Sequence, residues 1–113
     1  MVSVITMKQK IKVMIDRPLG SEHPDWPGFV YRVNYGYVPG VMAPDGEEQD
    51  VYVLGVDVPI QVFEGELIAI VHRYDDIEDK WVAAPEGIRY TKKQIEEILS
   101  FSEAYFDTDI ELL

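Results

Sequence analysis

A mainly β fold with one C-terminal α-helix is predicted by two observations. Short β-type runs separated by tight turns fill most of the 113 residues, and a single helical pattern follows them. The length fits one modest hydrophobic core, so we expect residues 1–113 to form a single domain, with residues 1–9 as a flexible N-terminal tail. No internal repeat, linker or low-complexity segment divides the chain.

The predicted strands follow the β-branched and aromatic residues. Ile11, Val13 and Ile15 alternate with polar or less apolar neighbours, which predicts a half-buried strand over 11–16. An ordered loop over 22–28 is followed by 29–33, which is either a short strand or an extended segment, and then by a bend rich in glycine and proline at 34–40. Further strands are predicted at 51–56, 61–63, 67–71 and 80–84, with Glu64-Gly65-Glu66 as a hairpin turn.

Thr91 begins the one predicted helix, which spans 91–106. Thr91-Lys92-Lys93-Gln94 matches a capping box, in which the Thr and Gln side chains satisfy free backbone amides. Apolar residues then recur at helical spacing, and this face is expected to cover one open side or end of the sheet. Residues 107–113 fit a short strand, a docked end or a frayed end. Five or six short strands with one helix predict a small closed barrel of the oligonucleotide/oligosaccharide-binding-like (OB-like) type.

The formal net charge of −11 argues against a nucleic-acid binder and against binding to an anionic membrane. It is compatible with a cation-dependent site, and equally with a charge that serves only solubility. The chain has no cysteine, so disulfides, zinc–thiolate sites and thiol nucleophiles are absent. No apolar run approaches the ~20 residues of a membrane span, and the first ten residues lack the apolar core of a signal peptide. We therefore expect a cytoplasmic protein.

One group of acids lies in the turn before a predicted strand. Asp45, Glu47 and Asp50 fall within six residues, and carboxylates this close repel one another unless a cation lies among them. Magnesium prefers oxygen ligands and keeps waters and substrate phosphates in its coordination shell. The alternative is a solvated acidic turn on an acidic protein.

A second group of acids precedes Lys80. Asp75, Asp76, Glu78 and Asp79 form a turn, and Lys80 opens the next predicted strand. We expect the two acidic turns to converge at one mouth of the barrel, where they hold two metal ions and Lys80 faces an anion between them. The alternative is a charged hairpin tip with a surface Lys–Glu pair of little energetic value.

The order of several segments resembles a known family. Tyr31-Arg32-Val33-Asn34-Tyr35-Gly36-Tyr37 followed by Asp45-Gly46-Glu47-Glu48-Gln49-Asp50-Val51 looks like the central signature of the soluble, family I inorganic pyrophosphatases. Lys80-Trp81-Val82-Ala83-Ala84-Pro85 is similar to a later strand that begins with the family's catalytic lysine. Ile15-Asp16-Arg17-Pro18-Leu19-Gly20-Ser21 resembles its first strand and turn. The resemblance covers roughly residues 11 to 87, and the joint order of the segments is its specific feature.

The resemblance implies an OB-like barrel, bound Mg²⁺ with Mn²⁺ as the alternative ion, and hydrolysis of inorganic pyrophosphate by metal-activated water. It implies a homo-oligomer and a small phosphorylated anion as partner, while the net charge already argues against nucleic acid and membrane partners. Arg17, His23, Arg32 and Arg73 are candidates to bind phosphate, since guanidinium offers a bidentate fork. The implied catalytic residues are Glu47, Lys80 and Tyr35, the implied substrate-binding tyrosine is Tyr31, and the implied metal ligands are Asp45, Asp50, Asp75 or Asp76, and Glu78.

The chain also departs from the family pattern. Glu47 and Glu78 stand where the family has aspartates, and Glu48 stands where it usually has proline. The early hairpin with a phosphate-binding arginine has no counterpart, and a C-terminal Tyr-Lys pair is missing. These departures favour two alternatives. One is a non-catalytic barrel that binds a metal, an anion or a protein partner, and the other is a hydrolase of another phosphorylated small molecule.

Overall fold

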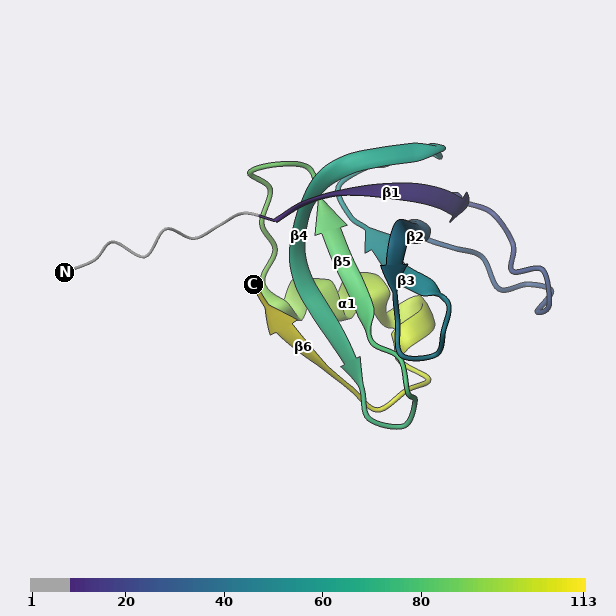
Figure 1. Cartoon of the computed structure of the whole chain (residues 1–113). Coiled ribbons are helices and arrows are strands. Elements are labelled where there is room, and N and C mark those ends of the chain that lie inside the picture. The colour runs from purple at the N-terminus through teal and green to yellow at the C-terminus, as the bar shows by residue number, and fades with distance from the viewer. Residues whose placement is uncertain (1–8) are drawn as a thin grey trace.

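The computed structural model describes residues 9–113, and five of its strands close into a barrel. The neighbours around the barrel are β1-β2-β3-β5-β4, and pairing of β1 with β4 closes it (Figure 1). All pairings are antiparallel except that of β3 with β5. The barrel strands are β1 (Lys10–Arg17), β2 (Asn34–Met42), β3 (Glu48–Val53), β4 (Val62–Arg73) and β5 (Lys80–Ala84). The predicted small OB-like barrel is confirmed. The predicted tail, apart from Gln9, lies outside the described residues.

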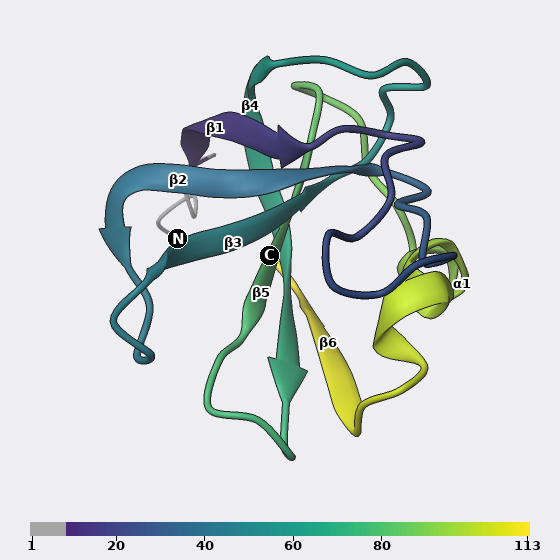
Figure 2. The ribbon, with the colours of Figure 1, turned by 90° about the vertical axis from the view of Figure 1, so that its right-hand side faces the viewer.

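Side-chain alternation along the strands divides the core into two layers. One layer fills the barrel interior and includes Val13, Val51 and Ala83, which come from three different strands. The other lies on the outer face, where Tyr52 and Val82 pack with residues of α1 (Lys92–Glu103). The helix therefore covers an outer face of the barrel, as Figures 1 and 2 show from two directions.

β4 is one continuous strand, so the predicted hairpin at Glu64-Gly65-Glu66 is wrong. Its first half pairs with β1 and its second half pairs with β5 and β6 (Thr108–Leu112), which carries it around a corner of the barrel. A Cβ added to Gly65 would lie 2.5 Å from the Ala84 carbonyl oxygen. The glycine therefore marks a close backbone approach within a strand, and not a turn.

β2 begins at Asn34, so the predicted bend over 34–40 is wrong, and so is the strand alternative for 29–33. The segment before it makes only an isolated bridge between Glu22 and Val30. The buried Asn34 side chain joins two loops, because it accepts from the Leu19 amide at 2.9 Å and donates to the Val58 carbonyl at 2.9 Å. This bonding allows an asparagine to begin a barrel strand.

The helix begins as predicted and ends earlier. Thr91 is the N-cap, and both hydrogen bonds of the capping box with Gln94 are present. The helix ends at Glu103 instead of residue 106, and the chain then forms β6 on the edge of β4, which decides among the three expectations for the tail. Within residues 9–113, the structure contains no helix with the length and apolar character needed to cross a membrane.

Candidate active site

Backbone pairing brings Asp50 and Lys80 together. Val51 lies opposite Trp81 in the parallel pairing of β3 with β5. Asp50 and Lys80, which directly precede these two residues, therefore lie side by side. Lys80 Nζ donates to Asp50 Oδ2 at 2.7 Å, and the Lys80 side chain is only 6% exposed. Both side chains alternate with residues that face or pack against the barrel interior. The contact therefore lies on the outer face, and the predicted location at a barrel mouth is wrong.

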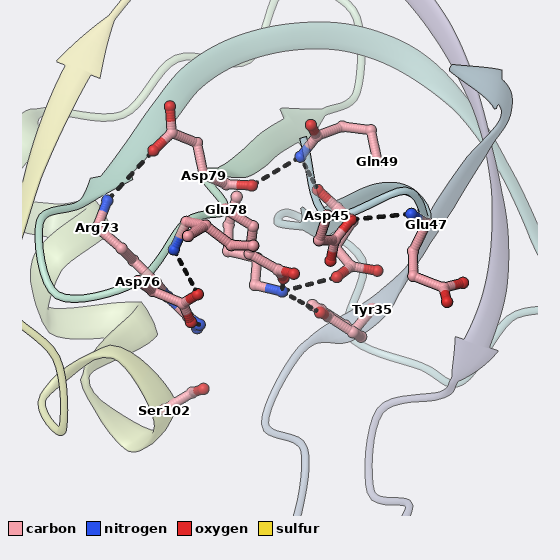
Figure 3. A network of polar contacts seen from close by, with 12 residues as sticks. Tyr35, Asp45, Glu47, Gln49, Arg73, Asp76, Glu78, Asp79 and Ser102 are labelled. Atoms are coloured by element: carbon pink, nitrogen blue, oxygen red, sulfur yellow. Dashed lines mark hydrogen bonds and ion pairs between the residues drawn. The ribbon is translucent and has the colours of Figure 1, made fainter. Parts of the chain in front are cut away.

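The ammonium of Lys80 is shared by three oxygen-bearing side chains. Besides Asp50, it donates to the Tyr35 hydroxyl at 3.0 Å and to the Glu78 carboxylate (Figure 3). Tyr35 comes from β2, and Glu78 lies two residues before Lys80. Two carboxylates around one ammonium leave an excess of negative charge at this point, which suits an additional cation.

Tyr35 stays protonated in this setting. Burial and the neighbouring Asp50 carboxylate raise the pKa of Tyr35 far above its ordinary value. Burial also raises the pKa of Tyr31, whose ring stacks on Tyr35 with 5.4 Å between centroids, while Arg17 opposes that rise. Both predicted tyrosines therefore face the site as neutral hydroxyl groups that can donate a hydrogen bond.

Sequence reasoning missed two side chains that shape the site. Gln49 is buried, and its Nε2 donates to the Asp79 carbonyl at 2.8 Å and to the Asp50 carbonyl at 3.1 Å, which ties the two acidic segments together. Asp16 lies at a register shift of β1 beside Tyr35. Desolvation raises the pKa of Asp16, Arg17 opposes this, and Asp50 adds to it. The only sequence signal for either residue was its place inside a quoted motif.

Of the first acidic group, Asp45 and Glu47 stay within the turn, unlike Asp50. The Glu47 amide donates to Asp45 Oδ1 at 2.9 Å, and the Gly40 amide donates to Glu48 Oε2 at 2.8 Å. Glu47 is exposed. In Figure 3, Asp45 lies between Glu47 and Glu78, and the Glu47 carboxylate is on the side away from Glu78. The turn between β2 and β3 is on the opposite side of the barrel from α1 in Figure 2. Among residues 9–113, neither Asp45 nor Glu47 forms a hydrogen bond or ion pair with Lys80, whose partners are Tyr35, Asp50 and Glu78.

The second acidic turn is directed partly toward the end of the helix. Asp75 Oδ2 accepts from the Asp107 amide at 3.2 Å, and Asp76 Oδ2 lies 3.3 Å from Arg73 Nη1. Of the five predicted metal ligands, Asp50 and Glu78 meet at the Lys80 ammonium, whereas Asp75 bonds to the Asp107 amide and Asp76 pairs with Arg73. Among residues 9–113, no three acidic or histidine side chains are already placed to hold one metal ion. The predicted convergence of the turns is therefore limited to one residue from each.

The three predicted arginines differ in their partners. Arg73 makes a two-pronged ion pair with Glu103, with Nε–Oε1 at 2.9 Å and Nη2–Oε2 at 2.6 Å, and lies over the Phe106 ring. Burial lowers the pKa of Arg73, but Glu103 more than offsets this, so the net shift is upward. Arg17 donates to the Asp16 carbonyl and also lies beside Tyr31, where it opposes the rise in the Tyr31 pKa, whereas Arg32 is exposed and does not line the cavity described next.

A cavity of about 570 Å³ opens beside Lys80. The loop before β2, the strands around Lys80 and the end of α1 each contribute to its walls. In Figure 2 this loop runs beside α1. The lining is mostly aromatic, with His23, Trp26, Phe29, Tyr31, Tyr35, Tyr52, Tyr105 and Phe106, and its polar members are Arg73, Asp76, Lys80 and Ser102.

Known proteins share both the sequence pattern and the barrel. The model of the family described as inorganic pyrophosphatase matches residues 1–108. The chain belongs to this family. It is thus an inorganic pyrophosphatase-like hydrolase by family, and the resemblance read from its motifs is confirmed. No curated protein matches the chain.

Solved inorganic pyrophosphatases share the fold at low sequence identity. The protein from Ehrlichia chaffeensis has a TM-score of 0.71 at 17% identity, covering 91% of this chain and 85% of that one. The protein from Coxiella burnetii has a TM-score of 0.68 at 20% identity, and the match covers 98% of this chain and 88% of that one. The protein from Neisseria gonorrhoeae has a TM-score of 0.64 at 22% identity, and the match covers 85% of this chain and 73% of that one. These similarities support the pyrophosphatase fold of this chain.

The pyrophosphatase resemblance implies a divalent metal, and the donors around Lys80 fit one. Asp50 and Glu78 supply hard carboxylate oxygens at one point, with the Asp50 side chain 30% exposed. Magnesium is commonly held by only one or two carboxylates, with waters and substrate phosphates completing its shell. The site therefore suits an ion that enters with its substrate better than one held in an all-protein cage.

Proposed function

We propose that this family member hydrolyses the phosphoanhydride bond of inorganic pyrophosphate in the presence of Mg²⁺, with Mn²⁺ as the alternative ion. The observation that supports the proposal is the buried Lys80 ammonium, shared by Asp50, Glu78 and Tyr35. Phosphoryl transfer depends mainly on positioning and on stabilising charge, and this arrangement offers a fixed cation, a protonated hydroxyl and two metal-binding oxygens.

Each residue at this point has a distinct proposed role. Asp50 and Glu78 would hold the metal ion, which when bound supplies Lewis acidity and a water of lowered pKa. Lys80 would place its ammonium against a phosphate oxygen, and Tyr35 would donate a hydrogen bond from its hydroxyl group to the same phosphate. A water oxygen bonds to one phosphorus, the bridging P–O bond breaks, and the departing phosphate keeps the bridging oxygen.

The other predicted residues keep proposed roles that need a change of side-chain direction. Glu47 would accept the proton of the attacking water, but its exposed carboxylate must first turn toward Lys80. Asp45 and Asp75 or Asp76 would hold further metal through carboxylate oxygens that their present hydrogen bonds leave available, or after releasing those bonds. Tyr31 would support the substrate through its stack on Tyr35, and Arg17, Arg32 and Arg73 would contact phosphate after similar rearrangement.

The test is phosphate release from pyrophosphate with and without Mg²⁺, comparing the native chain with Asp50→Asn. Asp57→Asn, an exposed acid elsewhere, is the matched control. We expect magnesium-dependent release that falls at least roughly a hundredfold in Asp50→Asn and is unchanged in Asp57→Asn. Undiminished magnesium-dependent activity in Asp50→Asn would show that the proposed site is wrong.

A second candidate is a non-catalytic barrel that binds metal or an anion. The commitment of Arg73 to Glu103 favours it, because a cation expected at phosphate is already neutralised. Calorimetry with Mg²⁺ and pyrophosphate distinguishes the two. Binding without turnover supports the second candidate, whereas turnover excludes it.

Two further predictions concern the protein as a whole, namely a cytoplasmic location and a homo-oligomer. The exposed apolar residues Leu112 and Leu113 at the end of β6 support self-association. Sedimentation of the purified chain, compared with a Leu112→Ser variant, measures the self-association directly.

A further inference from the structure

The cavity beside Lys80 contains a ladder of stacked rings that pyrophosphate would not use. Trp26 stacks on His23 with 4.4 Å between centroids, His23 is roughly parallel to Tyr31 at 6.2 Å, and Tyr31 stacks on Tyr35 at 5.4 Å. The last ring carries the hydroxyl that accepts from Lys80. The ladder therefore runs from the surface to the site of the proposed chemistry.

The outer end of the ladder is open to solvent and held in place. Trp26 is 62% exposed, an unusual position for a large aromatic side chain that packs no core. The loop that carries it is tied by backbone hydrogen bonds, including His23 N to Phe29 O at 2.8 Å and Tyr31 N to Ser21 O at 2.9 Å. A fixed loop that displays ring faces lowers the entropic cost of binding a flat ligand.

Charge also argues for a ligand with an uncharged part. The chain carries a net charge of −11, and the two cations that line the cavity, Lys80 and Arg73, are already paired with carboxylates. A small polyanion would find little cationic surface here apart from a bound metal. A ligand with a flat aromatic group would gain stacking energy that does not depend on charge.

We propose that the cavity binds a nucleoside diphosphate or triphosphate, with its base against the exposed outer ring of the ladder, Trp26, and its terminal phosphates at Lys80. The cavity of about 570 Å³ is within the range of pockets that enclose such ligands. This inference deepens the proposed function, because the same site would act on a phosphoanhydride that bears a base. Water adds to the terminal phosphorus, the bridging P–O bond breaks, the nucleotide product keeps the bridging oxygen, and one proton passes to solvent.

The test compares binding of ADP and of pyrophosphate, each with Mg²⁺, by calorimetry and by hydrolysis. Trp26→Ala removes the exposed ring, Trp26→Tyr keeps a ring, and Tyr74→Ala removes an exposed ring outside the cavity as a matched control. We expect Trp26→Ala to weaken ADP binding about tenfold and to leave pyrophosphate binding within twofold. Trp26→Tyr should restore most of the ADP affinity, and Tyr74→Ala should change neither ligand.

The outcomes separate this inference from the proposed function. Equal ADP affinity in the native chain and in Trp26→Ala overturns the inference, as does pyrophosphate hydrolysis without measurable ADP binding, which leaves the proposed function in place. Trp26-dependent ADP binding without any phosphate release supports the base subsite and contradicts the hydrolase. Failure of both ligands to bind overturns both.

Discussion

The Nζ atom of Lys80 lies 2.7 Å from Oδ2 of Asp50, and the parallel pairing of β3 with β5 sets this contact. Because Glu78 reaches the same ammonium, the lysine separates two carboxylates that would otherwise repel each other. The same three side chains then explain both local stability and a preference for an added cation.

Lys80→Met should make stability depend on magnesium. The variant leaves Asp50 and Glu78 facing each other without a cation, so we expect the free energy of unfolding to fall by about 2 kcal/mol. Bound Mg²⁺ can take the place of the ammonium, so the loss should shrink when Mg²⁺ is added. Urea denaturation with and without Mg²⁺ measures this, with exposed Lys12→Met as control. A loss that Mg²⁺ leaves unchanged would contradict the proposed metal position.

Tyr35→Phe should slow catalysis without unfolding the protein. It removes the hydroxyl that meets Lys80 and keeps the ring that stacks on Tyr31. We expect kcat for pyrophosphate to fall by about three- to tenfold, the value of one hydrogen bond. Since burial and Asp50 raise the pKa of Tyr35 far above its usual range, the rate ratio of native to variant should stay constant up to about pH 10. If the rate ratio already begins to fall as pH rises toward 10, Tyr35 ionises in that range and the prediction is wrong.

The pair of Arg73 and Glu103 should behave as a buried ion pair. Each side chain is 7% exposed, and Tyr52 also donates to Glu103 Oε2 at 2.5 Å. Glu103→Leu leaves the buried guanidinium with only its longer ion pair to Asp76, so we expect a loss of about 3–5 kcal/mol in the free energy of unfolding. The double variant Arg73→Met with Glu103→Leu should lose clearly less. A double-mutant cycle in urea tests this, and additive losses would refute the coupling.

Gly36→Ala should disrupt the barrel seam between β1 and β2. An added Cβ would lie 1.9 Å from the Met14 carbonyl oxygen, a backbone atom that cannot turn aside. We expect a loss of about 3 kcal/mol in the free energy of unfolding, or failure to fold. Gly87→Ala is the control: a Cβ there meets nothing within 4 Å, and only its φ of +83° resists the change, at a cost of about 1 kcal/mol. Equal losses in both variants would remove the steric explanation.

Local patterns predicted much of the fold. The capping box at Thr91 and the strand over 80–84 depend on residues within one or two turns of each other, and both are confirmed. The long β4 was missed, because the corner at Gly65 exists only when β1 closes the barrel. A glycine between two acids resembles a hairpin turn until that distant strand is placed.

The candidate site was predictable in its residue types and less so in its contacts. Ordered motifs pointed to Asp50 and Lys80, and barrel pairing then joined them across thirty residues. No sequence pattern indicated that Arg73 would pair with Glu103, because the end of a helix supplies that acid only after the chain has folded. The Gln49 bond to the Asp79 carbonyl is hidden for the same reason.

His72 should give the protein a pH-dependent stability. Its Nδ1 lies 2.9 Å from Asp79 Oδ2, and its Nε2 lies 2.7 Å from Glu111 Oε1, so the ring joins β4 to the turn before β5 and to β6. Hydrogen bonding to Glu111 raises the pKa of His72 most, burial opposes this rise, and the interactions with Asp79 add to it, so the net shift is upward. Asp109, the next nearby acid, is itself affected by the His72 charge. The protonated ring is therefore favoured in the folded state.

The sign of the effect follows from this raised pKa. A histidine whose pKa is higher in the folded state stabilises the fold fully below its unfolded pKa of about 6.5, and loses that contribution as pH rises through the folded pKa. The difference in free energy of unfolding between the native chain and His72→Gln should thus be largest near pH 6 and decline toward pH 8.5. Glu111→Gln keeps the histidine but removes its strongest partner, so the decline should become shallower and move to lower pH. A difference that is constant with pH, or that grows as pH rises, would mean that the two carboxylates do not hold a proton on His72.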